Sequence, residues 1–212
     1  MSVQLDFLKT IAYFAGLNES ELEQIKKLVF EKTAEKGEIV LYEGEPAEVL
    51  YFVVGGVVKV FKTSAAGKEQ IISLARPGDS FNDVPVFEGG LNLASAEAMM
   101  SVTLYGIRKT HFRNLLREHP WVTLNTIQVI SSKVEHLVSL IEDLSFRQVI
   151  GRVAKILLEY ARSDSDRKTK LTQQEMAAMA GTAREMVGRS LRILEEEEMI
   201  RLERHRIVIT DE

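Results

Sequence analysis

The sequence predicts an α+β protein in which an N-terminal β-roll is followed by a long helix and a C-terminal winged helix-turn-helix domain. Glycines punctuate the first half at regular intervals, apolar residues take a heptad spacing in the middle, and a glycine separates two short helical patterns near the C-terminus. The expected boundaries are residues 1–110, 111–145 and 146–212. A length of 212 residues is sufficient for two modest domains.

The first half alternates glycines with short runs of β-branched and aromatic residues. The expected strands are Ile39–Tyr42, Leu50–Val54, Val57–Phe61, Ile71–Ala75 and Ser101–Ile107. Short strands with turn signals at such intervals are typical of a sandwich or barrel. Before them, residues 19–30 have a helical pattern. Its apolar positions share one face: Leu22, Ile25, Leu28 and Val29.

The middle of the chain is helical from about His111 and takes a coiled-coil register after Pro120. The predicted seam consists of Ile127, Ile130, Val134, Leu137, Ile141 and Leu144. Alternating spacings of three and four are typical of a dimerising helix, whereas a helix packed on its own domain usually has a wider apolar stripe. The seam therefore predicts a homodimer. A second helical stretch follows Phe146, which is the expected hinge.

Two Thr-x-x-Glu sequences, beginning at Thr172 and Thr182, predict capping boxes that start two helices. Gly181 separates the helices. The second helix would run over residues 183–197 and bury three apolar side chains: Val187, Leu191 and Leu194. Two short helices joined through a glycine turn are typical of a helix-turn-helix, whose second helix enters the major groove of DNA.

The opposite face of that second helix carries Arg184, Glu185 and Arg189, around Gly188. Arginine can bond O6 and N7 of guanine, and glutamate can accept from the cytosine amine. We therefore expect these three residues to read bases. The alternative is that Glu185 only caps the helix and that the two arginines lie on a solvated face. The expected phosphate contacts are Thr172, Gln174 and Thr182 at helix starts, and Arg204, His205 and Arg206 in a basic wing between strands 199–202 and 207–210.

Composition excludes several other classes. The sequence has no cysteine, which excludes disulfides and cysteine-ligated iron–sulfur clusters. It has no long apolar run or secretory signal, so neither a membrane span nor export is expected, and a cytoplasmic location fits. No catalytic motif or metal-ligand spacing is present, so an enzyme is not expected. A sensor module that acts through protein contacts, without operative DNA reading, stays open as the alternative function.

The Thr-Ala-Arg-Glu-Met-Val-Gly-Arg sequence at 182–189 is similar to the recognition helix of the cyclic-AMP receptor protein and fumarate–nitrate reduction regulator family. The resemblance covers essentially the whole chain, including the order of β-roll, dimer helix and winged helix-turn-helix. It implies a homodimeric transcription regulator that reads a double-stranded DNA palindrome with TGTGA-like half-sites and has RNA polymerase as a partner. Activation and repression both stay open.

Residues 78–87 resemble that family's phosphate-binding cassette, but the match fails at the ligand-binding positions. Asn82-Asp83 stands where nucleotide binders have Gly-Glu, and Leu93-Ala94 stands where an Arg-Ser pair binds the cyclic phosphate. The positions that hold adenine from the dimer helix correspond to Leu137 and Val138. A phosphate would thus be buried without its charge partner, which disfavours cyclic AMP as the effector.

The resemblance implies an apolar effector pocket in place of the nucleotide site. Its expected lining is Phe81, Asn82, Asp83, Val84, Phe87, Leu93, Ala94, Leu137 and Val138. The cofactor or effector itself stays unknown. Haem, another small apolar or carboxylic ligand, and no ligand at all are the alternatives. The candidate haem ligands are His111, His119, His136, Met99 and Met100.

Overall fold

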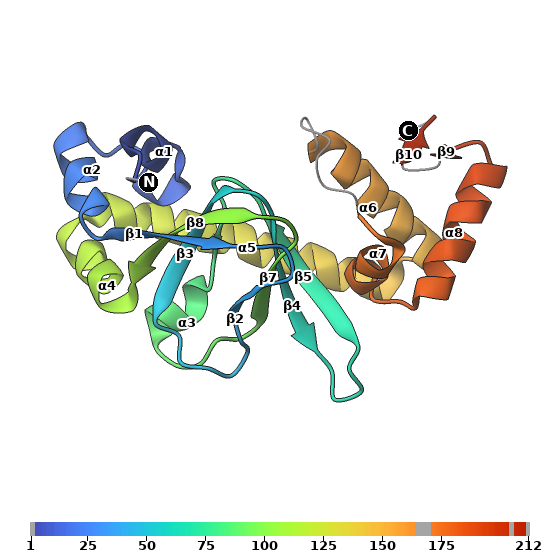
Figure 1. Ribbon diagram of the computed structural model, residues 1–212, viewed down its shortest axis with the longest axis horizontal. Helices are drawn as coiled ribbons and strands as arrows, with labels where there is room; N and C mark the ends of the chain where they lie inside the picture. Colours follow the sequence, from blue (N-terminus) through green and yellow to red (C-terminus); the bar gives the residue numbers. More distant parts are fainter. Residues whose placement is uncertain (1–2, 164–170, 204–205, 211–212) are drawn as a thin grey trace. The chain divides into compact units, whose positions relative to one another are not determined.

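The computed structural model describes residues 3–163, 171–203 and 206–210 (Figure 1). The chain divides into two compact units. The first comprises Met1–Lys62 and Ser73–His136, and the second comprises Thr63–Ile72 and Leu137–Glu212. The predicted α+β fold class is confirmed.

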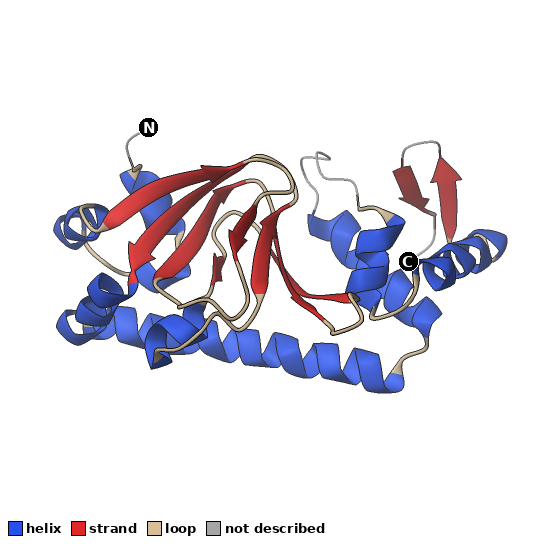
Figure 2. Cartoon of the chain, turned by 60° about the horizontal axis from the view of Figure 1, so that its bottom comes forward, coloured by secondary structure: helices blue, strands red, loops and turns tan. Residues whose placement is uncertain are grey.

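Two four-stranded sheets form the β domain, in the orders β1-β8-β3-β6 and β2-β7-β4-β5; all strands of the chain are red in Figure 2. The strands are β1 Val29–Ala34, β2 Ile39–Leu41, β3 Val49–Gly55, β4 Val58–Thr63, β5 Glu69–Ala75, β6 Ser80–Phe81, β7 Ser95–Ala98 and β8 Val102–Arg108. All five strands expected from the sequence are present, and β1, β6 and β7 are additional. Buried apolar side chains of both sheets, such as Val53 and Val58, form one core cluster.

The helix expected over residues 19–30 is shorter than predicted. Helix α2 covers Glu19–Lys26 and buries Leu22 and Ile25 as expected, but the chain leaves the helix and enters β1 at Val29. Val29 pairs with Ile107 of β8 in an antiparallel register. The prediction was wrong at this end because β-branched and aromatic residues gain sheet pairing and packing that a local pattern does not reveal.

The remaining helical elements of the first unit build a second core cluster beside β3 and β8. They are α1 Leu5–Thr10, the 3-10 helix η1 Ala12–Phe14, α3 Asp83–Glu88 and α4 Lys109–Glu118, and α5 Pro120–Phe146 begins in this unit. Tyr13 of η1 makes edge-to-face contacts with Phe52 and Phe112. These contacts place the Tyr13 hydroxyl beside the start of α3.

The second unit contains the predicted winged helix-turn-helix. Its elements are α6 Val149–Ser163, α7 Gln173–Ala180, α8 Arg184–Glu196, β9 Ile200–Glu203 and β10 Arg206–Ile209. The expected burial of Val187, Leu191 and Leu194 is confirmed, and these residues pack in one cluster with Val153 of α6 and Met176 of α7. Over the described ranges, no helix is long and apolar enough to cross a membrane.

Candidate DNA-binding face and effector domain

Helix α7 begins with the capping box that the sequence predicts at Thr172. The Glu175 backbone N–H donates to the Thr172 hydroxyl at 3.1 Å, and the Thr172 N–H donates to the Glu175 carboxylate at 2.6 Å. At the other end, Gly181 takes a left-handed conformation with φ 62°. Glycine suits this turn because it has no Cβ to clash. The helix is therefore fixed at both ends by its local sequence.

The second predicted capping box, at Thr182, is wrong. Helix α8 begins at Arg184 with Ala183 as its N-cap and no side-chain capping bond. The Thr182 N–H instead donates to the Ala177 carbonyl at 3.0 Å, which closes the turn after α7. Thr182 thus belongs to the end of the first helix. Its hydroxyl and the Glu185 carboxylate are not used for capping, so the alternative reading of Glu185 as a cap does not hold.

The outer face of α8 brings the three predicted base-reading residues together. Arg184, Glu185 and Arg189 are exposed and line one concave surface with a volume of about 400 Å³. Gly188 lies between them on the same face. A surface with several guanidinium groups beside one carboxylate presents donors and one acceptor, which is what base edges and phosphates require.

The same surface contains two residues that the sequence reasoning missed, Gln173 and Arg192. Arg192 follows Glu185 by seven positions and Arg189 by three, so helical spacing alone could have placed it on this face. Gln173 comes from the first turn of α7, and its Oε1 lies 3.7 Å from where a Cβ on Gly188 would stand. Only the packing of α7 against α8 reveals that residue.

The predicted phosphate contacts fall into two groups. Thr172 and Gln174 are exposed at the start of α7, and Thr182 is half-buried in the turn before α8. Arg204 and His205 lie outside the described residues. Arg206 lies in β10, but its side chain is outside the described part of the chain.

The predicted seam runs along α5, and most of its side chains are exposed. Ile127 is 57% exposed and Ile141 is 62% exposed, and Val134, Leu137 and Leu144 are also exposed, whereas Ile130 is half-buried. A row of large apolar side chains on a solvent-facing helix is unusual in a monomer. The alternative that this stripe packs on its own domain therefore does not hold for most of its residues.

Phe146, the predicted hinge, is the last residue of α5 and is 86% exposed. One turn earlier, the Asp143 carboxylate is buried and accepts from Arg147 Nε at 2.7 Å and from the Lys155 ammonium of α6. Lys155 Nζ also donates to Ser139 Oγ at 3.1 Å. The end of α5 and the first half of α6 are thus held by a shared buried carboxylate.

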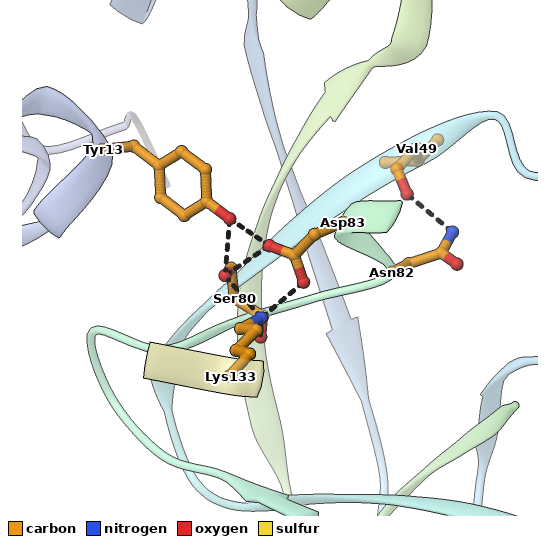
Figure 3. Close-up of polar contacts among 6 residues, drawn as sticks. All are labelled: Tyr13, Val49, Ser80, Asn82, Asp83 and Lys133. Atoms are coloured by element: carbon orange, nitrogen blue, oxygen red, sulfur yellow. Dashed lines mark hydrogen bonds and ion pairs between the residues drawn. The ribbon is translucent and has the colours of Figure 1, made fainter. Parts of the chain in front are cut away.

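The cassette region of the β domain has an unusual backbone at Asn82. This residue takes a left-handed conformation with φ 69°, and its side-chain amide donates to the Val49 carbonyl at 3.0 Å (Figure 3). Residues other than glycine rarely adopt this conformation, but asparagine tolerates it better than most. The resemblance noted from the sequence places a family glycine here, which agrees with the observed backbone.

Asp83, at the start of α3, is buried and fully engaged within the first unit (Figure 3). Its carboxylate accepts from the Tyr13 hydroxyl, from Ser80 Oγ at 2.7 Å and from the Lys133 ammonium. Burial and the negative charge of Asp83 raise the pKa of Tyr13 well above its usual range, so this phenol stays neutral and donates.

The other predicted pocket residues do not share one environment. Phe81 is buried and stacks on Tyr51 with ring centroids 5.3 Å apart, and Phe87 packs against Phe112. Val84 and Leu93 are exposed, and Ala94 is half-buried. On α5, Leu137 and Val138 are exposed. The effector pocket as a whole stays a prediction.

The candidate haem ligands are dispersed in the fold. Met99 is buried, Met100 is half-buried, and His111 and His136 are exposed. His119 Nδ1 lies 3.7 Å from the Glu21 carboxylate. Among the residues that the structure describes, no group of three or more histidine, cysteine or acidic side chains is placed to hold a metal ion.

Comparison with known proteins agrees with both halves of the fold. A model of the cyclic nucleotide-binding domain matches residues 31–119, and a model of the Crp-like helix-turn-helix domain matches residues 151–212. The chain is 30% identical over 176 residues to the cAMP-activated global transcriptional regulator CRP of Pasteurella multocida, covering 80% of this chain and 84% of that protein.

Two further matches cover nearly the whole chain. The Cyclic AMP receptor protein of Thermus thermophilus is 29% identical over 195 residues, covering 92% of this chain and 90% of the relative. The solved structure of the c-di-GMP responsive global regulator CLP of Xanthomonas campestris has a TM-score of 0.80 at 18% identity, covering 91% of this chain and 99% of that one. The latter supports the fold alone.

The fold and the two matched domain families define a DNA-binding protein with a cyclic-nucleotide-binding-like domain. The chain belongs to the Crp-Fnr family of transcription regulators.

Proposed function

We propose that this regulator is a homodimer that reads a palindrome with TGTGA-like half-sites through Arg184, Glu185 and Arg189. The observation that carries the proposal is the concave surface on which these side chains gather. None of these three side chains forms an ion pair with another described residue. Their hydrogen-bonding groups are therefore available to base edges.

The homodimer would form through α5, with a second copy of the chain covering the exposed seam. The heptad spacing of Ile127, Val134 and Ile141 matches what two parallel helices bury against each other. The dimer would place two recognition helices about one DNA turn apart, roughly 34 Å, as a palindrome requires. RNA polymerase as a partner rests on the family resemblance.

The proposed regulator does not depend on cyclic AMP. The residues at the phosphate positions, Leu93 and Ala94, offer no charge or hydroxyl, and Asp83 is already engaged by three donors of the protein. The relatives from Pasteurella multocida and Thermus thermophilus carry names that refer to cyclic AMP, so the prediction separates this chain from them. Its effector is another ligand or none.

Fluorescence anisotropy with a TGTGA palindrome and a scrambled duplex tests the proposal. Arg184→Ala and Arg189→Ala should each cost about 1–3 kcal/mol at the palindrome and reduce the preference over scrambled DNA. Arg117→Ala, on the exposed last turn of α4, is the matched control and should change neither affinity.

Two outcomes would count against the proposed function. If the alanine variants bound both duplexes as the wild type does, these arginines would not read bases. A wild-type chain that stayed monomeric in sedimentation and bound neither duplex would favour the sensor-module alternative. Ile141→Glu gives the dimer its own test, because a charge in the seam should dissociate the protein into monomers and abolish palindrome binding.

A further inference from the structure

Asp83 occupies the cassette position at which the family's nucleotide binders have an acid, yet its carboxylate is 5% exposed and points into the protein (Figure 3). One oxygen accepts from the Tyr13 hydroxyl and from Ser80 Oγ at 2.7 Å. The other oxygen accepts from Lys133 of α5. A ligand hydroxyl could reach this acid only by displacing a donor that the chain itself supplies.

Lys133 is as fully engaged as Asp83. Besides the carboxylate, its Nζ donates to the Ser80 carbonyl at 2.7 Å and to Ser80 Oγ at 3.0 Å. An ammonium group has three N–H donors, and here three acceptors surround it. A buried carboxylate is costly without such a cation, so the pair is mutually required.

The cluster Tyr13–Ser80–Asp83–Lys133 connects elements that are far apart in the sequence. Tyr13 belongs to η1, Ser80 to β6, Asp83 to α3 and Lys133 to α5, and all four lie in the first unit. Helix α5 is the element that continues to Phe146 and carries the proposed dimer seam. The contacts of Lys133 with Ser80 and Asp83 therefore fix the first part of the dimer helix to the cassette.

We propose that Lys133 is a built-in substitute for an effector at Asp83. Its ammonium fastens α3, the helix of the cassette, to the first part of α5, so that this part of the dimer helix keeps its position and palindrome binding needs no effector. Asp83 is then a positioning residue and not part of an effector-binding site. This inference rests on the proposed DNA-binding function. It adds that a side chain of the protein, Lys133, makes the contact with Asp83 that an effector would otherwise make.

The test compares the wild type with the double variant Lys133→Met/Asp83→Asn. Lys133→Met alone would leave a buried unpaired charge, whereas the double variant removes both charges with little change of volume. Lys62→Met is the matched control, because Lys62 pairs with Glu43 at 2.7 Å on the exposed surface of the same domain. Amide hydrogen exchange and palindrome affinity, both without added ligand, are the two measurements.

In the folded double variant, exchange across residues 83–88 and 122–136 should accelerate by about tenfold or more, and palindrome affinity should fall by about tenfold or more. Lys62→Met should leave both within about twofold of the wild type. A folded double variant whose exchange and affinity stayed within that range would overturn the proposal. If the wild type failed to bind the palindrome, the proposed function would fail, while the exchange data would still decide whether Lys133 fastens α5.

Discussion

Two polar clusters of this chain differ in whether their hydrogen-bonding groups are paired inside the protein or exposed to solvent. Around Asp83, donors and acceptors are matched within the first unit, and the carboxylate is buried. On α8, Arg184, Arg189 and Arg192 are exposed on a concave surface and form no ion pair with another described residue. Polar groups that satisfy one another stabilise a fold, whereas exposed groups gathered on a hollow are available to a partner.

The largest expected difference concerns stability. Lys133→Ala should lower the free energy of unfolding by about 3 kcal/mol, because it leaves the buried Asp83 carboxylate without its cation. Arg189→Ala should change that free energy by less than about 0.5 kcal/mol. Urea denaturation at neutral pH measures both. If both variants changed the free energy of unfolding by similarly small amounts, the two clusters would not differ in their contribution to stability.

The next effect separates the roles of arginines within α8. Arg189→Ala should cost about 1–3 kcal/mol of binding free energy at the palindrome and relax base preference. Arg192→Ala, one turn further along the helix, should weaken binding to all sequences and lower the slope of log affinity against log salt by about 1. Anisotropy titrations over a salt series distinguish the two. A sequence-dependent loss in Arg192→Ala would make it a base-reading residue instead.

The α8 face was predictable because its signals are local. The burial of Val187, Leu191 and Leu194 follows from helical spacing, and this burial leaves Arg184, Glu185 and Arg189 outside. The Thr172 capping box is equally local and is confirmed.

The remaining features depend on contacts between distant segments. Thr182 has the sequence of a cap, but its backbone N–H closes the preceding turn, so the prediction of a second capping box was wrong. Lys133 and Asp83 are 50 positions apart, and no periodicity relates them. Gln173 reaches the concave surface of α8 only because α7 packs on α8. Long-range packing decides these contacts, and one sequence does not display it.

Tyr13 offers a test of the buried cluster by pH. Its raised pKa means that the protonated phenol contributes stability fully below the ordinary tyrosine pKa of about 10, and that this contribution is lost as pH rises beyond it. Tyr13→Phe should lower the free energy of unfolding by about 1.5 kcal/mol at neutral pH. The difference from wild type should shrink in alkaline solution. A difference that stayed constant from neutral to alkaline pH would show that Tyr13 is not titrating in this way.

Substitution of Gly188, on the concave surface of α8, should have opposite effects on stability and on DNA binding. A Cβ at this position would meet Gln173 Oε1 at 3.7 Å, an ordinary contact, so Gly188→Ala should stabilise α8 by about 1 kcal/mol. The added methyl should nevertheless weaken palindrome binding by roughly 1 kcal/mol, since it fills the hollow that DNA approaches. Thermal unfolding and anisotropy measure the two effects. If the stabilised variant bound the palindrome as tightly as the wild type does, DNA would not approach this part of the concave surface.

The smallest expected effect comes from a control substitution in the second unit, away from the concave surface of α8. Glu198 lies two residues after the end of α8, in a left-handed conformation with φ 58°. Glu198→Gly should therefore raise the free energy of unfolding by roughly 0.5–1 kcal/mol without changing DNA affinity. Reduced affinity in this variant would extend the recognition surface to the far end of the helix.

The central claim is that the α8 face reads DNA sequence without cyclic AMP. The most direct measurement is wild-type affinity for a TGTGA palindrome and a scrambled duplex of equal length, with and without cyclic AMP, at one salt concentration. We predict a palindrome preference of about a thousandfold or more that cyclic AMP changes by less than about twofold. Equal affinity for the two duplexes, or a preference that appears only when cyclic AMP is added, would contradict the account.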